Sequence, residues 1–163
     1  MAQLLNFRLQ ALFALSGAPV VRMLEGLHGI TRREWRLLAW LAETGPLSPS
    51  ALAEASQLDR ARTSRAIGNL AGKNLVSRTA DAKDPRRAVV SITPAGQALY
   101  ARLFPDVAAL NAQLVAVLDD DELQVLDTAL QKITLQARAL NQQVAAEIKV
   151  QRHAGGSRRL RGQ

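Results

Sequence analysis

The chain has 163 residues, and its 21 lysines and arginines outnumber its 14 acidic residues to give a formal net charge of +7. This length suits one domain, or one compact domain with an appendage. The absence of cysteine excludes disulfides, thiolate nucleophiles and cysteine-ligated zinc. The two histidines, His28 and His153, are far apart in the sequence, so we expect neither a metal site nor a bound cofactor.

The first segment predicts an amphipathic helix. Apolar residues recur at helical spacing over residues 4–27. Pro19 lies inside this segment and lacks the amide hydrogen that an internal helical turn uses, so a kink or a restart is expected there. Gly29 is expected to end the segment.

Three helices are expected next, within residues 31–73. The first begins at Thr31, and Glu34 three residues later gives the spacing of a capping box. A Gly-Pro pair ends it, and a short helix follows over residues 48–57, with a serine cap and a proline in its first turn. The third helix starts after an aspartate cap and covers residues 59–73.

The apolar spacing then changes from helical to alternating. Residues 75–79 and 88–92 predict two strands, and the polar turn over residues 81–87 joins them into a hairpin with a charged tip. A long helix is expected to follow over residues 94–118, with an irregularity at Pro105.

The last helix begins with four acidic residues, which favour the positive end of the helix dipole. Its apolar residues from Leu123 to Val144 are separated by alternating steps of three and four, the heptad spacing of a helix that packs against a partner helix. Residues 151–163 have no apolar pattern and are expected to be a basic disordered tail.

The charge follows these segments. Residues 31–96 hold eleven basic and six acidic residues (+5), residues 97–148 carry −4, and residues 149–163 carry +5. No signal peptide or membrane span is recognisable, so we expect a cytoplasmic protein without a membrane partner. The basic middle segment favours a polyanionic partner.

The order of these elements is that of a winged helix-turn-helix flanked by other helices, in a mainly α fold with a small β-hairpin wing. We expect residues 31–96 to form the winged helix-turn-helix. Residues 1–30 and 97–150 would supply the flanking helices.

The helix after the aspartate cap has one polar face. At 100° per residue, Arg62, Arg65 and Asn69 lie opposite the apolar positions Ile67 and Leu70. Arginine can pair with guanine and asparagine with adenine in the major groove, and a serine suits a phosphate contact. A solvated polar face is the alternative. The candidate DNA contacts on this helix are Arg62, Thr63, Ser64, Arg65 and Asn69.

The hairpin tip supplies further candidate DNA contacts, namely Lys83, Arg86 and Arg87. An arginine on a stiff wing can enter a narrow minor groove, where the potential is most negative. Asp84 could hold such an arginine by a local ion pair. The alternative is a solvated turn whose charges pair with one another.

Several of these segments resemble the MarR family (multiple-antibiotic-resistance regulators). The wing residues 81–86 and the following residues 90–96 are similar to the family's wing signature, although Pro85 stands where the family often has a basic residue. Residues 29–38 and 58–65 resemble the family's second helix and the start of its recognition helix. The similarity covers roughly residues 5–148.

The resemblance implies a homodimer formed through the first and last helices, with Arg86 reaching the minor groove. It also implies a sequence-specific transcriptional regulator of an inverted-repeat operator, and a repressor released by a small, aromatic, anionic ligand. The absence of cysteine excludes the family's thiol-oxidation branch, and the scarcity of histidine argues against its zinc-sensing branch. A basic architectural or RNA-binding winged-helix protein is the alternative.

The resemblance places a ligand pocket between the dimer helices and the winged domain. An arginine or histidine beside aromatic rings suits a carboxylate ligand. Each candidate also has an ordinary role as a core, interface or solvated residue. The candidate ligand-binding residues are Phe13, Ser16, His28, Arg32, Trp35 and Arg36. No nucleophile–base set, metal spacing or phosphate-binding glycine loop is present, so we do not expect an enzyme.

Overall fold

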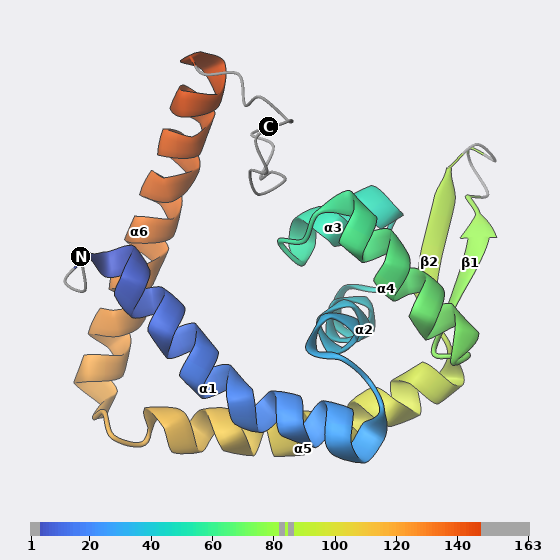
Figure 1. Ribbon diagram of the computed structural model, residues 1–163, viewed down its shortest axis with the longest axis horizontal. Helices are drawn as coiled ribbons and strands as arrows, with labels where there is room; N and C mark the ends of the chain where they lie inside the picture. Colours follow the sequence, from blue (N-terminus) through green and yellow to red (C-terminus); the bar gives the residue numbers. More distant parts are fainter. Residues whose placement is uncertain (1–3, 82–83, 85–86, 148–163) are drawn as a thin grey trace. The chain divides into compact units, whose positions relative to one another are not determined.

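The computed structural model describes residues 4–81, 84 and 87–147 (Figure 1). The chain forms two compact units, Met1–Leu114 and Val115–Gln163. The elements are α1 (Leu5–His28), α2 (Arg32–Thr44), α3 (Pro49–Ala55), α4 (Arg60–Gly72), β1 (Val76–Ala80), β2 (Ala88–Ile92), α5 (Pro94–Val115) and α6 (Asp120–Glu147). The predicted fold class, mainly α with a two-stranded hairpin, is confirmed. The predicted tail lies outside the described residues. The division of the chain into residues 1–30, 31–96, 97–150 and 151–163 stays a prediction.

The first helix continues through its proline. α1 is one helix from Leu5 to His28 with Pro19 inside it, so the expected restart is wrong, although the helix bends part-way along its length (Figure 1). Pro19 is exposed, so the ring and the lost hydrogen bond face solvent. α1 ends at Gly29, which adopts a left-handed φ of 61°. α5 likewise continues through Pro105.

The helix starts of the winged helix-turn-helix are confirmed. Each predicted cap accepts a hydrogen bond from a backbone amide in the first turn of its helix, with N···O distances of 3.2, 3.2 and 2.8 Å for Thr31, Ser48 and Asp59. α3 ends at Ala55, two residues before the predicted end, because Gln57 adopts a left-handed φ of 54°. This residue forms the turn between α3 and α4.

The two strands form an antiparallel hairpin with a register from Val76 opposite Ile92 to Ala80 opposite Ala88. β2 also pairs with the loop between α2 and α3. The amide of Leu47 donates to the carbonyl of Val90 at 3.0 Å, and the amide of Val90 donates to the carbonyl of Leu47 at 2.8 Å. The base of the wing is therefore bonded to the helix-turn-helix.

The core of the first unit is formed by α2 together with the end of α1, α3, α4, the hairpin and the first half of α5. Its fully buried side chains include Leu24, Ile30, Leu37, Leu38, Leu41, Leu52, Leu70, Val90 and Leu103. Tyr100 on α5 stacks on Trp35 with 5.5 Å between ring centroids, and its hydroxyl donates to Glu43 Oε1 at 3.0 Å. Aromatic and polar contacts therefore join α5 to α2.

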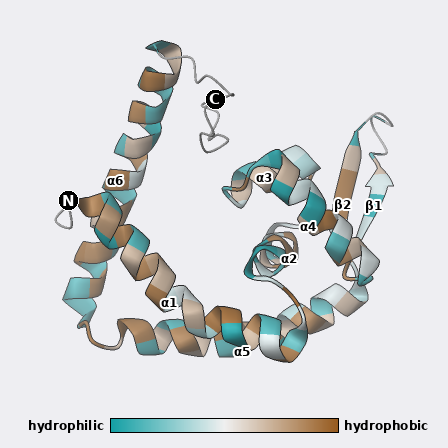
Figure 2. Ribbon diagram, in the orientation of Figure 1, coloured by the Kyte–Doolittle hydropathy of each residue, from teal (hydrophilic) through white to brown (hydrophobic). Residues whose placement is uncertain are grey.

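The long helix α6 has no buried residue. The apolar residues of its heptad pattern alternate with polar ones along the helix (Figure 2). Leu126, Leu130, Ile133, Leu140 and Val144 are each between 40% and 49% exposed. An apolar stripe of this kind is typical of a helix that has not met its partner, so the partner helix stays a prediction.

Among the described residues, no single helix is long and apolar enough to cross a membrane. The consecutive helices α5 and α6 pass such a test only when they are taken together.

Candidate nucleic-acid interface and adjoining cavity

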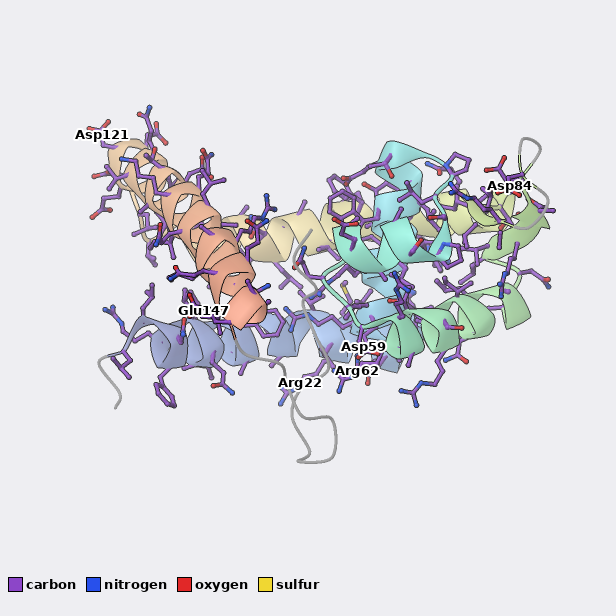
Figure 3. All side chains as sticks on the ribbon, turned by 90° about the horizontal axis from the view of Figure 1, so that it is seen from above. Arg22, Asp59, Arg62, Asp84, Asp121 and Glu147 are labelled. Atoms are coloured by element: carbon purple, nitrogen blue, oxygen red, sulfur yellow. The ribbon has the colours of Figure 1, made fainter. Side chains whose placement is uncertain are left out.

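The polar face of α4 is exposed, as the sequence predicts. Arg62, Ser64, Arg65 and Asn69 are all exposed. The side chain of Arg62 is 57% exposed, and its Nε lies 3.0 Å from Asp59 Oδ2. Asp59 thus caps α4 and also holds Arg62 beside the start of the helix (Figure 3). The N-terminal half of α4 thus presents the guanidinium groups of Arg62 and Arg65 to solvent.

Thr63 does not belong to this face. It is 1% exposed, and its hydroxyl donates to the carbonyl of Asp59 at 2.9 Å. Thr63 therefore lies on the core side of α4, and its inclusion among the DNA contacts is wrong. Thr63 stabilises the first turn of α4 from inside.

The C-terminal end of α4 is tied to the start of α2. The ammonium of Lys73 donates to the carbonyl of Gly29 at 2.7 Å and to Glu34 Oε2 at 2.9 Å. Burial raises the pKa of Glu34, but the hydrogen bonds from Lys73, Thr31 and Asn69 and the charge of Lys73 outweigh burial and hold this pKa below its ordinary value. Asn69 therefore has an internal polar neighbour as well as an exposed surface.

The wing carries an internal ion pair. Arg87 Nε lies 3.3 Å from Asp84 Oδ2, with side chains 75% and 46% exposed. The amide of Arg87 also donates to the carbonyl of Asp84 at 2.8 Å, which closes the turn. The other two predicted wing contacts, Lys83 and Arg86, lie outside the described residues.

Two further exposed arginines are not among the predicted DNA contacts. Arg60 is the first residue of α4 and is exposed, and Arg78 is exposed on β1. Alternation from the buried Val76 does not distinguish the faces of β1, because every later residue of that strand is exposed. The position of Arg60 in the first helical turn was the available signal.

A cavity of about 340 Å³ lies between α1, α2 and α5 in the first unit. Four of the six predicted ligand residues line it, namely Ser16, Arg32, Trp35 and Arg36. The other lining residues are Gly17, Val20, Ala39, Trp40, Glu43, Val107, Leu110, Asn111 and Leu114. Trp40 and Glu43 could have been found from the sequence, since they follow Arg36 by four and seven residues, one and two helical turns.

Arg32 is fixed against α1. Its guanidinium carbon lies 3.9 Å from the ring centroid of Phe13, a cation–π contact. A Cβ at Gly17 would overlap the guanidinium of Arg32, so glycine allows this close approach. Phe13 does not itself line the cavity but holds a residue that does.

Arg36 lines the same cavity but bonds to the turn after α3 and not to α1. Its Nη1 donates to the carbonyl of Ser56 at 3.0 Å. Burial lowers the pKa of Arg36, and the charges of Arg32 and Arg33 lower it further. Within the part of the chain that the structure describes, neither Arg32 nor Arg36 forms an ion pair. The wall of the cavity therefore holds two cations that carboxylates do not neutralise.

His28 was wrongly placed among the ligand residues. It does not line the cavity, and its Nδ1 lies 3.5 Å from Nη2 of Arg102 on α5. His28 ends α1, about three turns beyond Ser16, so one side of α1 does not bring both residues to the same site. Over the described residues, no group of three or more histidine, aspartate or glutamate side chains could hold a metal ion.

Comparison with known proteins finds one family that is similar to the central part of the chain. The family model described as the MarR family matches residues 28–87, which run from the end of α1 through the helix-turn-helix to the wing. Over these residues the chain is similar to the MarR family. MarR-family regulators are DNA-binding transcription factors without enzymatic activity, which confirms the prediction that the chain is not an enzyme.

An uncharacterized HTH-type transcriptional regulator of Bacillus subtilis, YwaE, is 30% identical over 89 residues, which cover 55% of this chain and 52% of that protein. The chain thus matches about half the length of this relative. The homoprotocatechuate degradative operon repressor of Escherichia coli is 26% identical over 114 residues, 70% of this chain and 74% of that protein. Both matches are longer than the predicted winged helix-turn-helix, residues 31–96.

A solved structure supports the fold. Bordetella bronchiseptica BpsR, whose DNA binding is described as regulated by 6-hydroxynicotinic acid, superposes with a TM-score of 0.74 at 20% identity. The match covers 82% of this chain and 95% of that chain. The shared fold therefore extends beyond the winged domain into the flanking helices.

Proposed function

We propose that this MarR-type regulator is a homodimeric repressor that binds an inverted-repeat operator and releases it when a small aromatic anion occupies the cavity. The observation that carries the proposal is the pair of guanidinium groups, Arg32 and Arg36, that no carboxylate among the described residues neutralises. Repression is supported by the function of the Escherichia coli relative.

The DNA-binding part of the proposal rests on the exposed cations of the winged domain. Arg62 and Arg65 lie on the solvent face of α4, and Arg87 lies on the wing. Arginine on such a helix pairs bidentately with guanine in the major groove. Lys83 and Arg86 are proposed as further wing contacts from the sequence alone.

The ligand chemistry follows from the walls of the cavity. Trp35 and Trp40 offer aromatic surface, and the two arginines offer charge-assisted hydrogen bonds to a carboxylate. The volume of about 340 Å³ suits a single-ring compound. The carboxylate of Glu43 also lines the cavity but accepts a hydrogen bond from Tyr100, whose pKa is raised by burial and by Glu43. The regulation of BpsR by 6-hydroxynicotinic acid, an aromatic carboxylic acid, is consistent with this chemistry.

The homodimer is supported by apolar surface on the flanking helices. Leu12, Phe13 and Leu15 on α1 are 53%, 53% and 75% exposed, and the heptad stripe of α6 is exposed as well. Exposed apolar surface of this extent marks an interaction site. Two symmetric recognition helices would meet major grooves about 34 Å apart, which requires an inverted repeat.

The test is footprinting on the DNA upstream of the gene that encodes the chain, with and without added ligand. A protected palindrome is expected, with affinity that falls steeply as salt rises. Benzoate should weaken binding, and benzyl alcohol, which has the same ring but no charge, should not. Uniform coverage of the DNA would support the non-specific alternative, and equal effects of the two compounds would refute an anion site.

A further inference from the structure

Arg36 belongs to two features at once. Its side chain lines the cavity, and its Nη1 donates a hydrogen bond of 3.0 Å to the carbonyl of Ser56, twenty residues along the chain. Ser56 directly follows α3, which lies beside α2, the helix that carries Arg36 (Figure 1). The cavity and the helix-turn-helix are therefore joined through one side chain.

Ser56 lies in the turn that sets the direction of α4. It is the C-cap of α3 and is 2% exposed, and the left-handed Gln57 follows it. Asp59, the N-cap of α4, comes three residues after Ser56. The turn has its own hydrogen bonds, from Ser56 Oγ to the carbonyl of Leu52 at 2.6 Å and from the amide of Leu58 to the carbonyl of Ala53 at 3.0 Å. A displacement of the Ser56 carbonyl would therefore be carried into the start of α4.

The partner of Arg36 in this structure is a neutral carbonyl. A carboxylate offers a guanidinium an opposite charge and two parallel N–H···O bonds, whereas the neutral carbonyl of Ser56 accepts one bond and carries no net charge. Burial and the charges of Arg32 and Arg33 act against the charged form of Arg36, so an anion in the cavity would relieve this cost. The guanidinium thus has a stronger potential acceptor on the cavity side than on the turn side.

We propose that Arg36 is the positioning residue that fixes the turn between α3 and α4, and that an anion in the cavity competes with Ser56 for its guanidinium. The first half of this proposal concerns the ligand-free protein, and the second half rests on the proposed anion site. Arg32 has a different part, because Phe13 and the backbone at Gly17 hold it on the α1 side of the cavity. Arg32 would hold the ligand in place, and the loss of the bond from Arg36 to Ser56 would change the position of α4.

The ligand-free test compares Arg36→Met, Arg36→Lys and Arg33→Met in the 163-residue chain. Methionine keeps the length and apolar stem but cannot donate a hydrogen bond, and lysine can still reach an acceptor. Arg33 is the matched control, since it is an exposed cation on the same helix. Affinity is measured for the DNA site that the wild type selects from a random pool and for unselected DNA, and the thermal midpoint of each variant is recorded.

Arg36→Met is expected to weaken binding of the selected site by about tenfold relative to Arg33→Met, because the turn no longer has its charged donor. Binding of unselected DNA should be equal in the two variants within about twofold, since each loses one positive charge. Arg36→Lys should restore most of the loss. Equal affinity of Arg36→Met and Arg33→Met for the selected site would overturn the positioning role, as would loss of selected and unselected binding in the same proportion.

The coupling test adds benzoate and follows both DNA release and the fluorescence of Trp35 and Trp40, which line the cavity. In the wild type and in Arg33→Met, benzoate should quench the fluorescence and weaken operator binding. In Arg36→Met, quenching should persist at higher benzoate concentration while operator affinity no longer changes. Undiminished release from Arg36→Met would overturn the competition and leave the proposed function intact. If benzoate neither quenches nor releases the wild type, both the anion site and the competition fail, and the ligand-free comparison alone decides the positioning role.

Discussion

Lys73 ties the end of α4 to the first turn of α2, and Lys73→Met is expected to lower the free energy of unfolding by about 2 kcal/mol at pH 7. Its ammonium bonds the Gly29 carbonyl at 2.7 Å and Glu34 Oε2 at 2.9 Å. Removing one partner of a fully buried pair costs about 3–5 kcal/mol. Glu34 is 1% exposed, but the side chain of Lys73 is 39% exposed, so water can replace part of what the ammonium supplies. The expected cost is therefore below that range.

The cost of Lys73→Met should depend on pH. The pKa of Glu34 is below its ordinary value in the folded wild type, so its stabilising effect is present above the unfolded pKa and is lost as the pH falls through the folded pKa. Without Lys73, burial acts on Glu34 with less opposition and raises its pKa, so the variant carboxyl becomes neutral at a higher pH. The difference between wild type and variant should shrink from pH 7 to pH 4.

Urea unfolding followed by tryptophan fluorescence measures this difference, at one fixed protein concentration so that association does not alter the comparison. Arg33→Met, which removes an exposed cation from the same helix, is the control and should change the stability by less than about 0.5 kcal/mol. In a Glu34→Gln background, where the amide oxygen can still cap α2, Lys73→Met should cost much less than in the wild type. An equal cost at both pH values, or in both backgrounds, would refute the buried ion pair.

Three further predictions concern packing, base reading and assembly. Gly96→Ala should destabilise the fold by about 1–3 kcal/mol, because its Cβ would overlap the backbone carbonyl of Leu75. Gly26→Ala, which has open space around it in α1, should stabilise the fold by about 0.5–1 kcal/mol. Shifts of the thermal midpoint in the same direction for both variants would contradict this. Arg65→Ala should cost about 1–3 kcal/mol of operator binding and relax base preference, measured by competition with random DNA; an equal loss on random DNA would exclude base reading. Leu130→Asp should shift the chain toward monomer in sedimentation, while Thr128→Asp on the opposite side of α6 should not; an unchanged mass for Leu130→Asp would exclude the heptad stripe from the interface.

The local parts of the fold were predictable from the sequence because their causes are local. The caps Thr31, Ser48 and Asp59 each act on an amide three residues later, so a short motif defines them. The apolar and polar faces of α4 follow from helical geometry in the same way. Pro19 misled the prediction because an exposed proline costs one hydrogen bond without ending a helix that is packed on its other side.

The cavity was only half predictable. Arg32, Trp35 and Arg36 lie within five residues on α2, and their grouping was visible. The α5 wall, from Val107 to Leu114, is about seventy residues away, and only tertiary packing brings it there. His28 was included because it is close to α2 in the sequence, but its side chain does not lie on the cavity side of α1. The link from Arg36 to Ser56 has no sequence signal, because any backbone carbonyl can accept a hydrogen bond.

The pairing of Leu47 with Val90 has a consequence for how the wing moves. An isolated two-stranded hairpin is marginally stable in water, but here β2 gains two more hydrogen bonds on its inner edge. The amide of Val90 should therefore exchange its hydrogen slowly, at a rate set by opening of the helix-turn-helix itself, while the amide of Arg87 at the turn should exchange much faster. Within one hairpin, the residue bonded to the helix-turn-helix would therefore open far less often than the residue at the end of the turn.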